Sequence, residues 1–104
     1  MLADVDEVLY QADLDGRWTY LNPAWERLLG HRVDDVLGRP YHENLHPDDR
    51  AASLVSLAKV VTGDAEQCRT IRRMIHRDGH LVTVELSARL LHDDDGAAVG
   101  VTGT

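Results

Sequence analysis

The stretch LVTVELSARL, residues 81–90, alternates between apolar and polar side chains from Val82 onward. Every even position from 82 to 90 is apolar, and every odd position from 83 to 89 is polar. Because successive side chains of a β-strand point to opposite faces, this period predicts a strand with one buried face and one solvated face. We therefore expect a sheet that is covered on one side.

Turn signals lie on both sides of this strand. Asp78-Gly79 precedes it, and the run HDDDGAA (92–98) follows it before VGVTGT (99–104) begins a further strand. With EQCRTIRRMIH (66–76) upstream, the last third of the chain predicts an antiparallel meander. The three aspartates at 93–95 fit a solvated turn better than a calcium loop, which needs alternating ligands over a longer span.

Upstream of the meander, VLYQADLDGRWTYLN (8–22) holds two short β-prone runs around Asp15-Gly16, which predicts a hairpin. Asn22-Pro23 follows it directly. We expect Asn22 to cap a helix and Pro23 to take the first helical position.

The helix that starts there is expected to place Trp25, Leu28 and Leu29 on one face and to end at Gly30. The run HRVDDVLGRPYHENL (31–45), broken by glycine and proline, predicts short helical turns. Helices that are separate from an antiparallel meander indicate the α+β class.

The stretch LHPDDR (45–50) has the residue types of a reactive cluster, a metal site or a helix start. Pro47 suits the first turn of a helix, Asp48 and Asp49 suit the positive end of its dipole, and His46 lies at the N-cap. A catalytic role would need a nucleophile or a second base in a fixed relation to His46, and the sequence shows none. We interpret the stretch as a helix start.

The helix that follows is expected to bury one apolar face and to end at Gly63. The residues of that face are Leu54, Leu57, Ala58 and Val61.

Composition narrows the function classes. The chain has 104 residues, enough for one domain, and a formal net charge of −7 from 18 acidic and 11 basic residues. That balance argues against a nucleic-acid or anionic-membrane surface. No apolar run approaches membrane-spanning length, and the start has no signal-peptide pattern. Cys68 is alone, so an internal disulfide or a cysteine zinc site cannot form, and we expect a cytoplasmic domain.

Six motifs in order resemble the PAS family with its C-terminal PAC segment. They are LDGRWTYLNPAWERLLG, VLGRP, LHPDDR, HRDGH, DDDG and VGVTGT. The resemblance implies one PAS domain over 1–104: a five-stranded antiparallel sheet closed on one face by short helices and one longer helix. It also implies a flanking segment at 1–10, a PAC-like three-stranded meander at 65–104 with a truncated last strand, and an origin in a longer signalling protein. The effector of such a protein is typically a histidine kinase, a cyclic-dinucleotide enzyme, a phosphatase or a transcription factor.

In this family the chamber between sheet and helices holds the ligand or cofactor. The residues expected to line it are Tyr20, Trp25, Leu28, Leu45, Leu54, Leu57, Met74, Val82, Val84, Leu86 and Thr102. The same residues would form the core of a closed, dry chamber, and the sequence leaves both interpretations open.

The resemblance argues against flavin. The region GRPYHENL (38–45) lacks the reactive cysteine of photosensory relatives, and Cys68 falls on a strand instead. The positions that would hold the flavin ring are Met74, Val84 and Thr102, where relatives have side-chain amides.

Haem and metal ions are not expected either. No histidine lies between residues 47 and 62, where oxygen-sensing relatives carry the axial ligand, and His42 and His46 only flank the chamber. His76 lies on a predicted strand and could face the chamber. The remaining histidines, His31, His80 and His92, are expected in or beside exposed turns, and no convergent set of metal ligands is predicted.

Two registers fit the hairpin at Asp78-Gly79. A two-residue turn would place Ile75 opposite Val82, whereas a three-residue loop with a left-handed Gly79 would place Met74 there. The family pattern favours the second register, which leaves Ile71 and Ile75 on the outer face. We expect that face to bind the N-terminal segment and a second protomer, so that a homodimer forms. The N-terminal residues at helix-compatible spacing are Leu2, Val5, Val8 and Leu9.

Three functions are considered. The first is a signalling module that senses a small ligand, the second is a ligand-free module for dimerisation or relay, and the third is a small enzyme. No Ser/His/Asp, Cys/His or phosphate-loop arrangement is present, so an enzyme is not expected.

Overall fold

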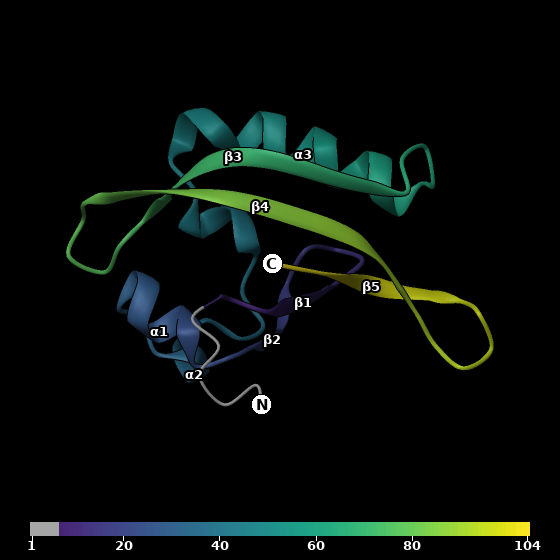
Figure 1. The fold of residues 1–104 in the computed structure, drawn as a ribbon, viewed down its shortest axis with the longest axis horizontal. Coiled ribbons are helices and arrows are strands. Elements are labelled where there is room, and N and C mark those ends of the chain that lie inside the picture. Colours follow the sequence, from purple (N-terminus) through teal and green to yellow (C-terminus); the bar gives the residue numbers. More distant parts are fainter. Residues whose placement is uncertain (1–6) are drawn as a thin grey trace.

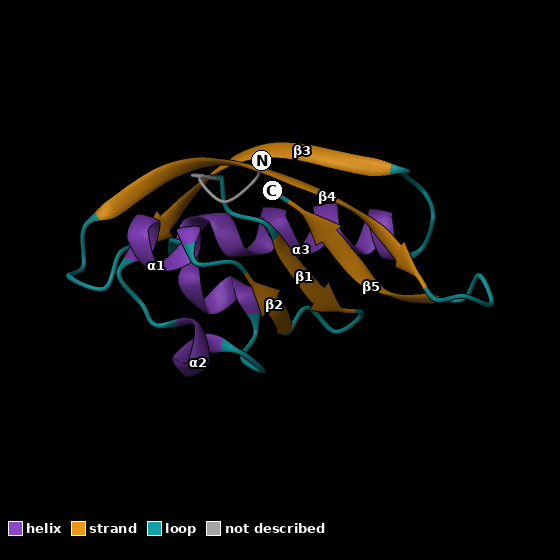
Figure 2. Cartoon of the chain, turned by 60° about the horizontal axis from the view of Figure 1, so that its bottom comes forward, coloured by secondary structure: helices purple, strands orange, loops and turns teal. Residues whose placement is uncertain are grey.

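The computed structural model describes residues 7–104 and confirms the α+β class with a five-stranded antiparallel sheet. The sheet order is β2-β1-β5-β4-β3. The strands are β1 (Tyr10–Asp13), β2 (Trp18–Leu21), β3 (Gln67–Ile75), β4 (Leu81–His92) and β5 (Ala98–Gly103). The helices are α1 (Ala24–Leu29), α2 (Val33–Val36), the 3₁₀ turn η1 (Tyr41–Asn44) and α3 (Pro47–Val61). The long helix α3 runs beside β3 (Figure 1), and the helices lie on one side of the curved sheet (Figure 2).

The β1–β2 hairpin forms at Asp15-Gly16 as expected. Asp13 Oδ1 accepts hydrogen bonds from the backbone amides of Asp15 and Arg17 at 3.0 and 2.9 Å. Gly16 has φ +84°, a left-handed conformation that glycine adopts without strain.

A bulge disturbs the alternation in β2. The pairing register shifts between Gln11 and Ala12, so β2 carries one extra residue opposite β1. As a result Tyr20 points outward and is 47% exposed, whereas Leu21 is buried at 5%.

The β3–β4 hairpin adopts the register with the three-residue loop. Met74 pairs with Val82 and Ile71 with Glu85, as the family pattern favoured. Gly79 has φ +98°, and the backbone amide of His76 donates to the carbonyl of His80 at 2.8 Å. Ile71 therefore lies on the outer face, 68% exposed.

The expected cap of α1 was wrong, and the helix begins at Ala24, one residue later than predicted, although it ends before Gly30 as expected. The N-cap residue is Pro23, and among residues 7–104 no side chain makes a capping hydrogen bond there. Asn22 is buried and binds the N-terminal segment instead: its Oδ1 accepts from the Leu9 amide at 3.0 Å, and its Nδ2 donates to the Glu7 carbonyl at 2.9 Å. Within α1, Leu28 is 37% exposed.

The start of α3 confirms the interpretation of LHPDDR. His46 is the N-cap, and its Nδ1 accepts a hydrogen bond from the Asp48 amide at 3.0 Å. The helix ends at Val61, two residues before Gly63.

The buried face of α3 differs from the predicted one. Ser53 and Val60 are buried, whereas Leu54 is 45% exposed and Ala58 is also exposed. The apolar pattern predicted the wrong face because a polar residue, Ser53, faces the sheet. Its hydroxyl can be buried there because it has a hydrogen-bond partner in the Tyr41 hydroxyl at 2.8 Å.

The core lies between the sheet and the helices. Its most completely buried large side chains are Trp25, Leu29, Leu45, Val60 and Val101. The ring of Trp18 packs edge-on against three aromatic neighbours, with centroid distances of 5.4 Å to Tyr10, 5.2 Å to Trp25 and 6.1 Å to Tyr41. This aromatic cluster joins β1 and β2 to α1 and η1.

Candidate ligand chamber

A small cavity of about 20 Å³, here called the inner chamber, lies between α3 and the sheet. That volume is close to what one ordered water needs. Its lining residues are Tyr10, Ala12, Trp18, Tyr41, Ser53, Ser56, Leu57, Cys68, Thr70, Leu86, Ala88 and Val101.

The two phenols of the inner chamber already have hydrogen-bond partners. The Tyr10 hydroxyl donates to the Ser87 carbonyl at 2.6 Å, and the Tyr41 hydroxyl pairs with Ser53. Burial raises the pKa of both phenols, Tyr10 more strongly, so both stay neutral.

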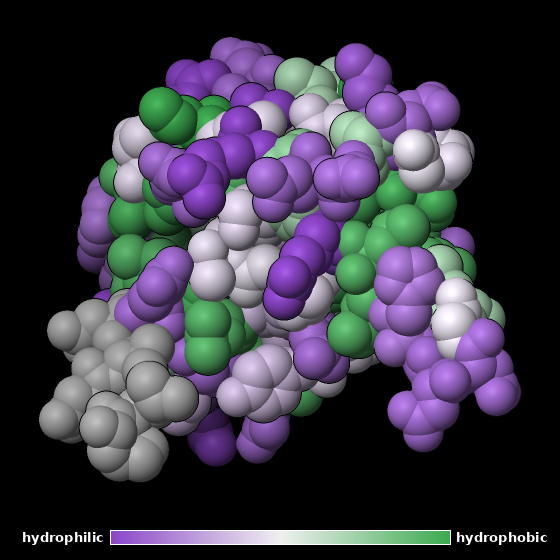
Figure 3. All heavy atoms as spheres, turned by 45° about the vertical axis from the view of Figure 1, so that its right-hand side comes forward, coloured by the Kyte–Doolittle hydropathy of each residue, from purple (hydrophilic) through white to green (hydrophobic). Residues whose placement is uncertain are grey.

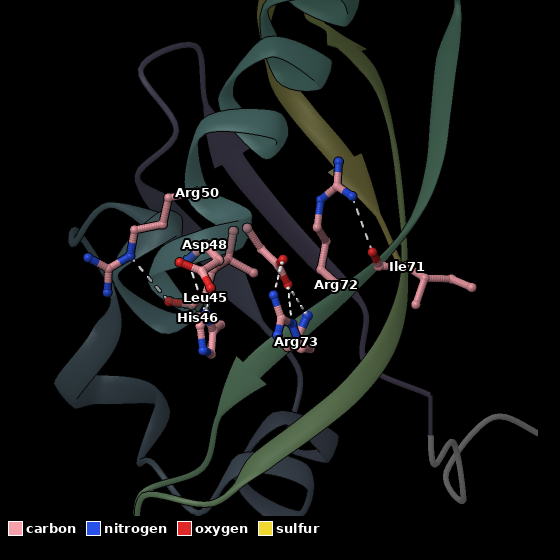
Figure 4. Close-up of polar contacts among 8 residues, drawn as sticks. Leu45, His46, Asp48, Arg50, Ile71, Arg72 and Arg73 are labelled. Carbon is pink, nitrogen blue, oxygen red and sulfur yellow. Dashed lines mark hydrogen bonds and ion pairs between the residues drawn. The ribbon is translucent and has the colours of Figure 1, made fainter.

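A positive charge lies beside this chamber. The side chain of Arg72 is half-buried, and its Nη2 donates to Ser56 Oγ at 3.4 Å. Its Nε is buried and has no hydrogen-bond partner among residues 7–104. Arg72 and Ile71 project from opposite sides of β3 (Figure 4).

A second hollow, the α1 cleft, has a volume of about 270 Å³. Its walls come from α1, the strands β1 to β4, and both ends of the described chain. They consist of Glu7, Val8, Tyr10, Trp18, Trp25, Leu28, Met74, Val84, Glu85, Leu86 and Thr104. Trp25 is 1% exposed, and its indole Nε1 is buried without an acceptor in the part of the chain that the structure describes. A buried donor without a partner is unfavourable unless a ligand or water accepts from it.

The start of α3 is fixed to β3 by an ion pair that we call the α3 clamp. Asp49 Oδ1 lies 2.8 Å from Arg73 Nη2, and Asp49 Oδ2 accepts from Arg73 Nε at 3.1 Å and from the Arg73 backbone amide at 2.8 Å (Figure 4). Hydrogen bonds from the Arg73 side chain and amide lower the pKa of Asp49 to about 2.

The opposite face of the sheet carries a shallow groove of about 440 Å³, here called the outer groove. It is lined by Leu9, Tyr10, Gln11, Tyr20, Gln67, Arg69, Ser87, Ala88, Arg89, Thr102, Gly103 and Thr104. The molecular surface is mixed in character: hydrophilic side chains cross the face in Figure 3, and hydrophobic ones stand in separate groups beside them.

Comparison with known proteins assigns this arrangement to a family. A family model described as the PAS fold matches residues 1–104. The chain belongs to the PAS family.

The similar proteins include signalling proteins. Sporulation kinase C of Bacillus subtilis (strain 168) is 21% identical over 104 residues, and this PAS domain spans 24% of that protein's length. A PAS domain from Colwellia psychrerythraea has a TM-score of 0.85 at 23% identity, with 95% of this chain and 83% of that chain covered. A domain of a sensory box sensor histidine kinase/response regulator from Geobacter sulfurreducens has a TM-score of 0.75 at 29% identity, with the same coverage. No helix within residues 7–104 is long and apolar enough to cross a membrane.

The residues expected to line one chamber are divided between several places in the PAS domain. Leu57 and Leu86 line the inner chamber, whereas Trp25, Leu28, Met74, Val84 and again Leu86 line the α1 cleft.

The other expected chamber residues lie elsewhere. Leu45 is fully buried in the core, and Val82 is partly buried and packs against that core. Leu54 is exposed on α3. Tyr20 and Thr102 line the outer groove. The bulge turns Tyr20 outward, and the Thr102 hydroxyl donates a hydrogen bond to the Tyr10 carbonyl at 3.1 Å.

Sequence reasoning missed Tyr10, Trp18, Tyr41 and Ser53 in the chamber lining. Tyr10 and Trp18 flank the first hairpin, and their aromatic character was the available signal. Tyr41 and Ser53 form a pair across twelve residues that no local pattern contains.

The residues expected at a dimer interface are partly described. Ile71 and Leu9 are 68% and 41% exposed, and Ile75 is half-buried. Leu2 and Val5 lie outside the described residues.

Proposed function

We propose that this PAS domain is a sensory module of a larger signal-transduction protein and that its ligand binds in the α1 cleft. The unpartnered indole N–H of Trp25 carries this proposal. The inner chamber, at about 20 Å³, has little room for a ligand, whereas the α1 cleft, at about 270 Å³, approaches the size of ordinary ligand pockets.

The chemistry of the cleft defines the ligand class. Leu28, Met74 and Val84 offer apolar contacts, and Trp25 Nε1 offers one hydrogen bond to an acceptor. A small, mostly apolar molecule with one carbonyl or similar acceptor fits this set. The catalytic output belongs to an effector domain of the same protein, and the kinase and histidine kinase among the similar proteins support a cytoplasmic signalling role.

Binding tests can use the two tryptophans as a matched pair. A set of small carbonyl compounds is screened by NMR of the indole N–H signals, where a ligand is expected to shift the Trp25 signal. Trp25→Phe keeps an aromatic ring but removes the donor, and it should weaken binding about tenfold, as loss of a buried hydrogen bond does. Trp18→Phe is the control, because Trp18 Nε1 already donates to Asn44 Oδ1 at 3.1 Å.

Equal weakening in the two variants would contradict the assigned role of the Trp25 donor. Absence of any compound that shifts the Trp25 signal would leave the ligand-free relay as the better function.

We also propose that the outer face of the sheet forms a homodimer interface that relays the signal. Two apolar side chains that line the outer groove support this proposal, because Leu9 and Tyr20 are 41% and 47% exposed. Ile71, on the outer face of β3, is 68% exposed and supports it as well. A symmetric dimer would present the same patch on both subunits.

Sedimentation of matched charge variants tests the dimer. Ile71→Asp should shift the protein toward monomer while the fold persists. Leu54 lies on α3 and is 45% exposed, so the control variant Leu54→Asp should leave association unchanged. A dimer that tolerates Ile71→Asp would remove this face from the interface.

A further inference from the structure

The tip of the β3–β4 hairpin gathers three potential metal ligands that the sequence analysis did not expect to converge. His76, Asp78 and His80 each offer one ligand atom, and these atoms lie within 4.8 Å of one another. They come together because the chain reverses at Asp78-Gly79, which brings the residues before and after the turn side by side.

The spacing of the three groups suits a small cation. His76 Nδ1 lies 3.3 Å from Asp78 Oδ1, and His80 Nδ1 contacts the same carboxylate oxygen. Zinc bonds of 2.0–2.2 Å in tetrahedral geometry separate neighbouring ligand atoms by roughly 3.3–3.6 Å. The two imidazole rings stack with centroids 4.4 Å apart and an interplanar angle of 19°, so the rings must turn apart to direct one nitrogen of each at the same ion.

The surrounding backbone holds this group in place. The Arg77 amide donates to the Leu29 carbonyl at 2.8 Å, which fixes the turn against the end of α1. The His76 ring lies directly against Gly30, where an added Cβ would be 2.8 Å from His76 Cε1. The site is also accessible, because the side chains of Asp78 and His80 are 60% and 57% exposed.

The charge of the site suits a cation as well. The Asp78 carboxylate is held in place by the His80 backbone amide, which donates to its Oδ1 at 3.0 Å. Two imidazoles and one carboxylate are nitrogen and oxygen donors that Zn²⁺ accepts, whereas Mg²⁺ and Ca²⁺ prefer oxygen donors alone.

We propose that His76, Asp78 and His80 bind one Zn²⁺ ion, with water completing the coordination. Ligation takes the lone pair of His76 Nδ1, which at present accepts from the Asp78 amide at 3.1 Å. The Asp78 amide must therefore change its partner when the ion binds. Because the ion binds the folded hairpin, it also stabilises the domain, by an amount that grows with the logarithm of its concentration above the Kd.

Zinc titration of metal-free protein without a histidine tag tests this proposal. Calorimetry should give one ion per chain, and ¹⁵N NMR should show its largest amide shift at Asp78. Asp78→Asn and His80→Gln should each lower the affinity at least about tenfold, since even loss of an outer partner of a metal site has that effect. His80→Gln is suitable because His80 is exposed, and its thermal unfolding in chelator should match that of the parent protein.

His92→Gln is the matched control, because His92 precedes the acidic turn at 93–95 but lies outside the three-ligand group. This variant should bind zinc as tightly as the parent protein. Three results would each overturn the proposal: no saturable binding, undiminished binding by His80→Gln, or an equal loss in His92→Gln. Equal shifts of the same amides by Mg²⁺ would likewise show that only the exposed charge attracts cations.

Discussion

The two faces of β3 differ sharply although both carry apolar side chains. Met74 on the inner face is 3% exposed, and Ile71 on the outer face is 68% exposed. Composition alone would not separate them, since isoleucine is at least as often buried as methionine. The three-residue loop at the hairpin tip determines which face of β3 is buried, because a one-residue change of register exchanges the faces of a whole strand. Turn geometry thus selects which apolar residues build the core and which remain for a partner.

The largest expected effect contrasts these two residues directly. Met74→Ala should lower the free energy of unfolding by about 2–5 kcal/mol, because it leaves a cavity in the core. Ile71→Ala should lower it by less than about 0.5 kcal/mol at concentrations where the protein is monomeric. Urea titration measures both, and comparable losses would mean that the faces are not as different as described.

A smaller contrast concerns the helix that covers the inner face. Leu57 is half-buried against the inner chamber, so Leu57→Ala should cost about 2 kcal/mol, at the lower end for such truncations. Lys59 is exposed, and Lys59→Ala should cost under about 0.5 kcal/mol. Chemical denaturation of the pair would contradict the placement of α3 if Lys59→Ala proved the more damaging change.

The polar pair of the inner face should contribute less. Ser53→Ala removes the partner of the buried Tyr41 hydroxyl and should cost about 1 kcal/mol. A double-mutant cycle with Tyr41→Phe isolates the interaction, since the second change should cost less once the first has been made. Additive losses would show that the two hydroxyls do not depend on each other.

Acid should weaken the α3 clamp without affecting the apolar core. The pKa of Asp49 is lowered from 3.8 to about 2 in the folded protein, chiefly by the hydrogen bond from the Arg73 side chain. A lowered folded-state pKa means that the stabilisation is fully present above about pH 4 and is lost as the pH falls through about 2. Asp49→Asn should therefore flatten the dependence of the urea midpoint between pH 4 and pH 2. Asp48→Asn is the control, because the Asp48 side chain is 79% exposed, and an equal flattening there would argue against the clamp.

The sequence predicted the fold well because its signals were local. The period of two at 81–90, the glycine turns and the proline at the start of α3 each depend on neighbouring residues, and each appears in the structure. The hairpin register needed one further observation, the family pattern.

The candidate sites could be predicted only in part, because they depend on contacts between distant residues. The bulge that turns Tyr20 outward lies between two strands, and the partner of Ser53 lies on another element. The helical period assigned Leu54 to the buried face and left Ser53 out of it, whereas Leu54 is 45% exposed and Ser53 is buried. The convergence at His76 and His80 was missed for another reason: His76 was assigned to a strand and His80 to an exposed turn, although the hairpin itself brings them together.

The α3 clamp also has a consequence for how chains meet. β3 is an outermost strand of the sheet, and such strands can recruit a strand from another molecule and start aggregation. At Arg73 both backbone groups are already occupied, since the amide donates to Asp49 and the carbonyl accepts from the His46 amide at 2.8 Å. An incoming strand would have to displace the first turn of α3 to pair there. The same contacts that attach the helix thus protect the sheet from edge-to-edge polymerisation.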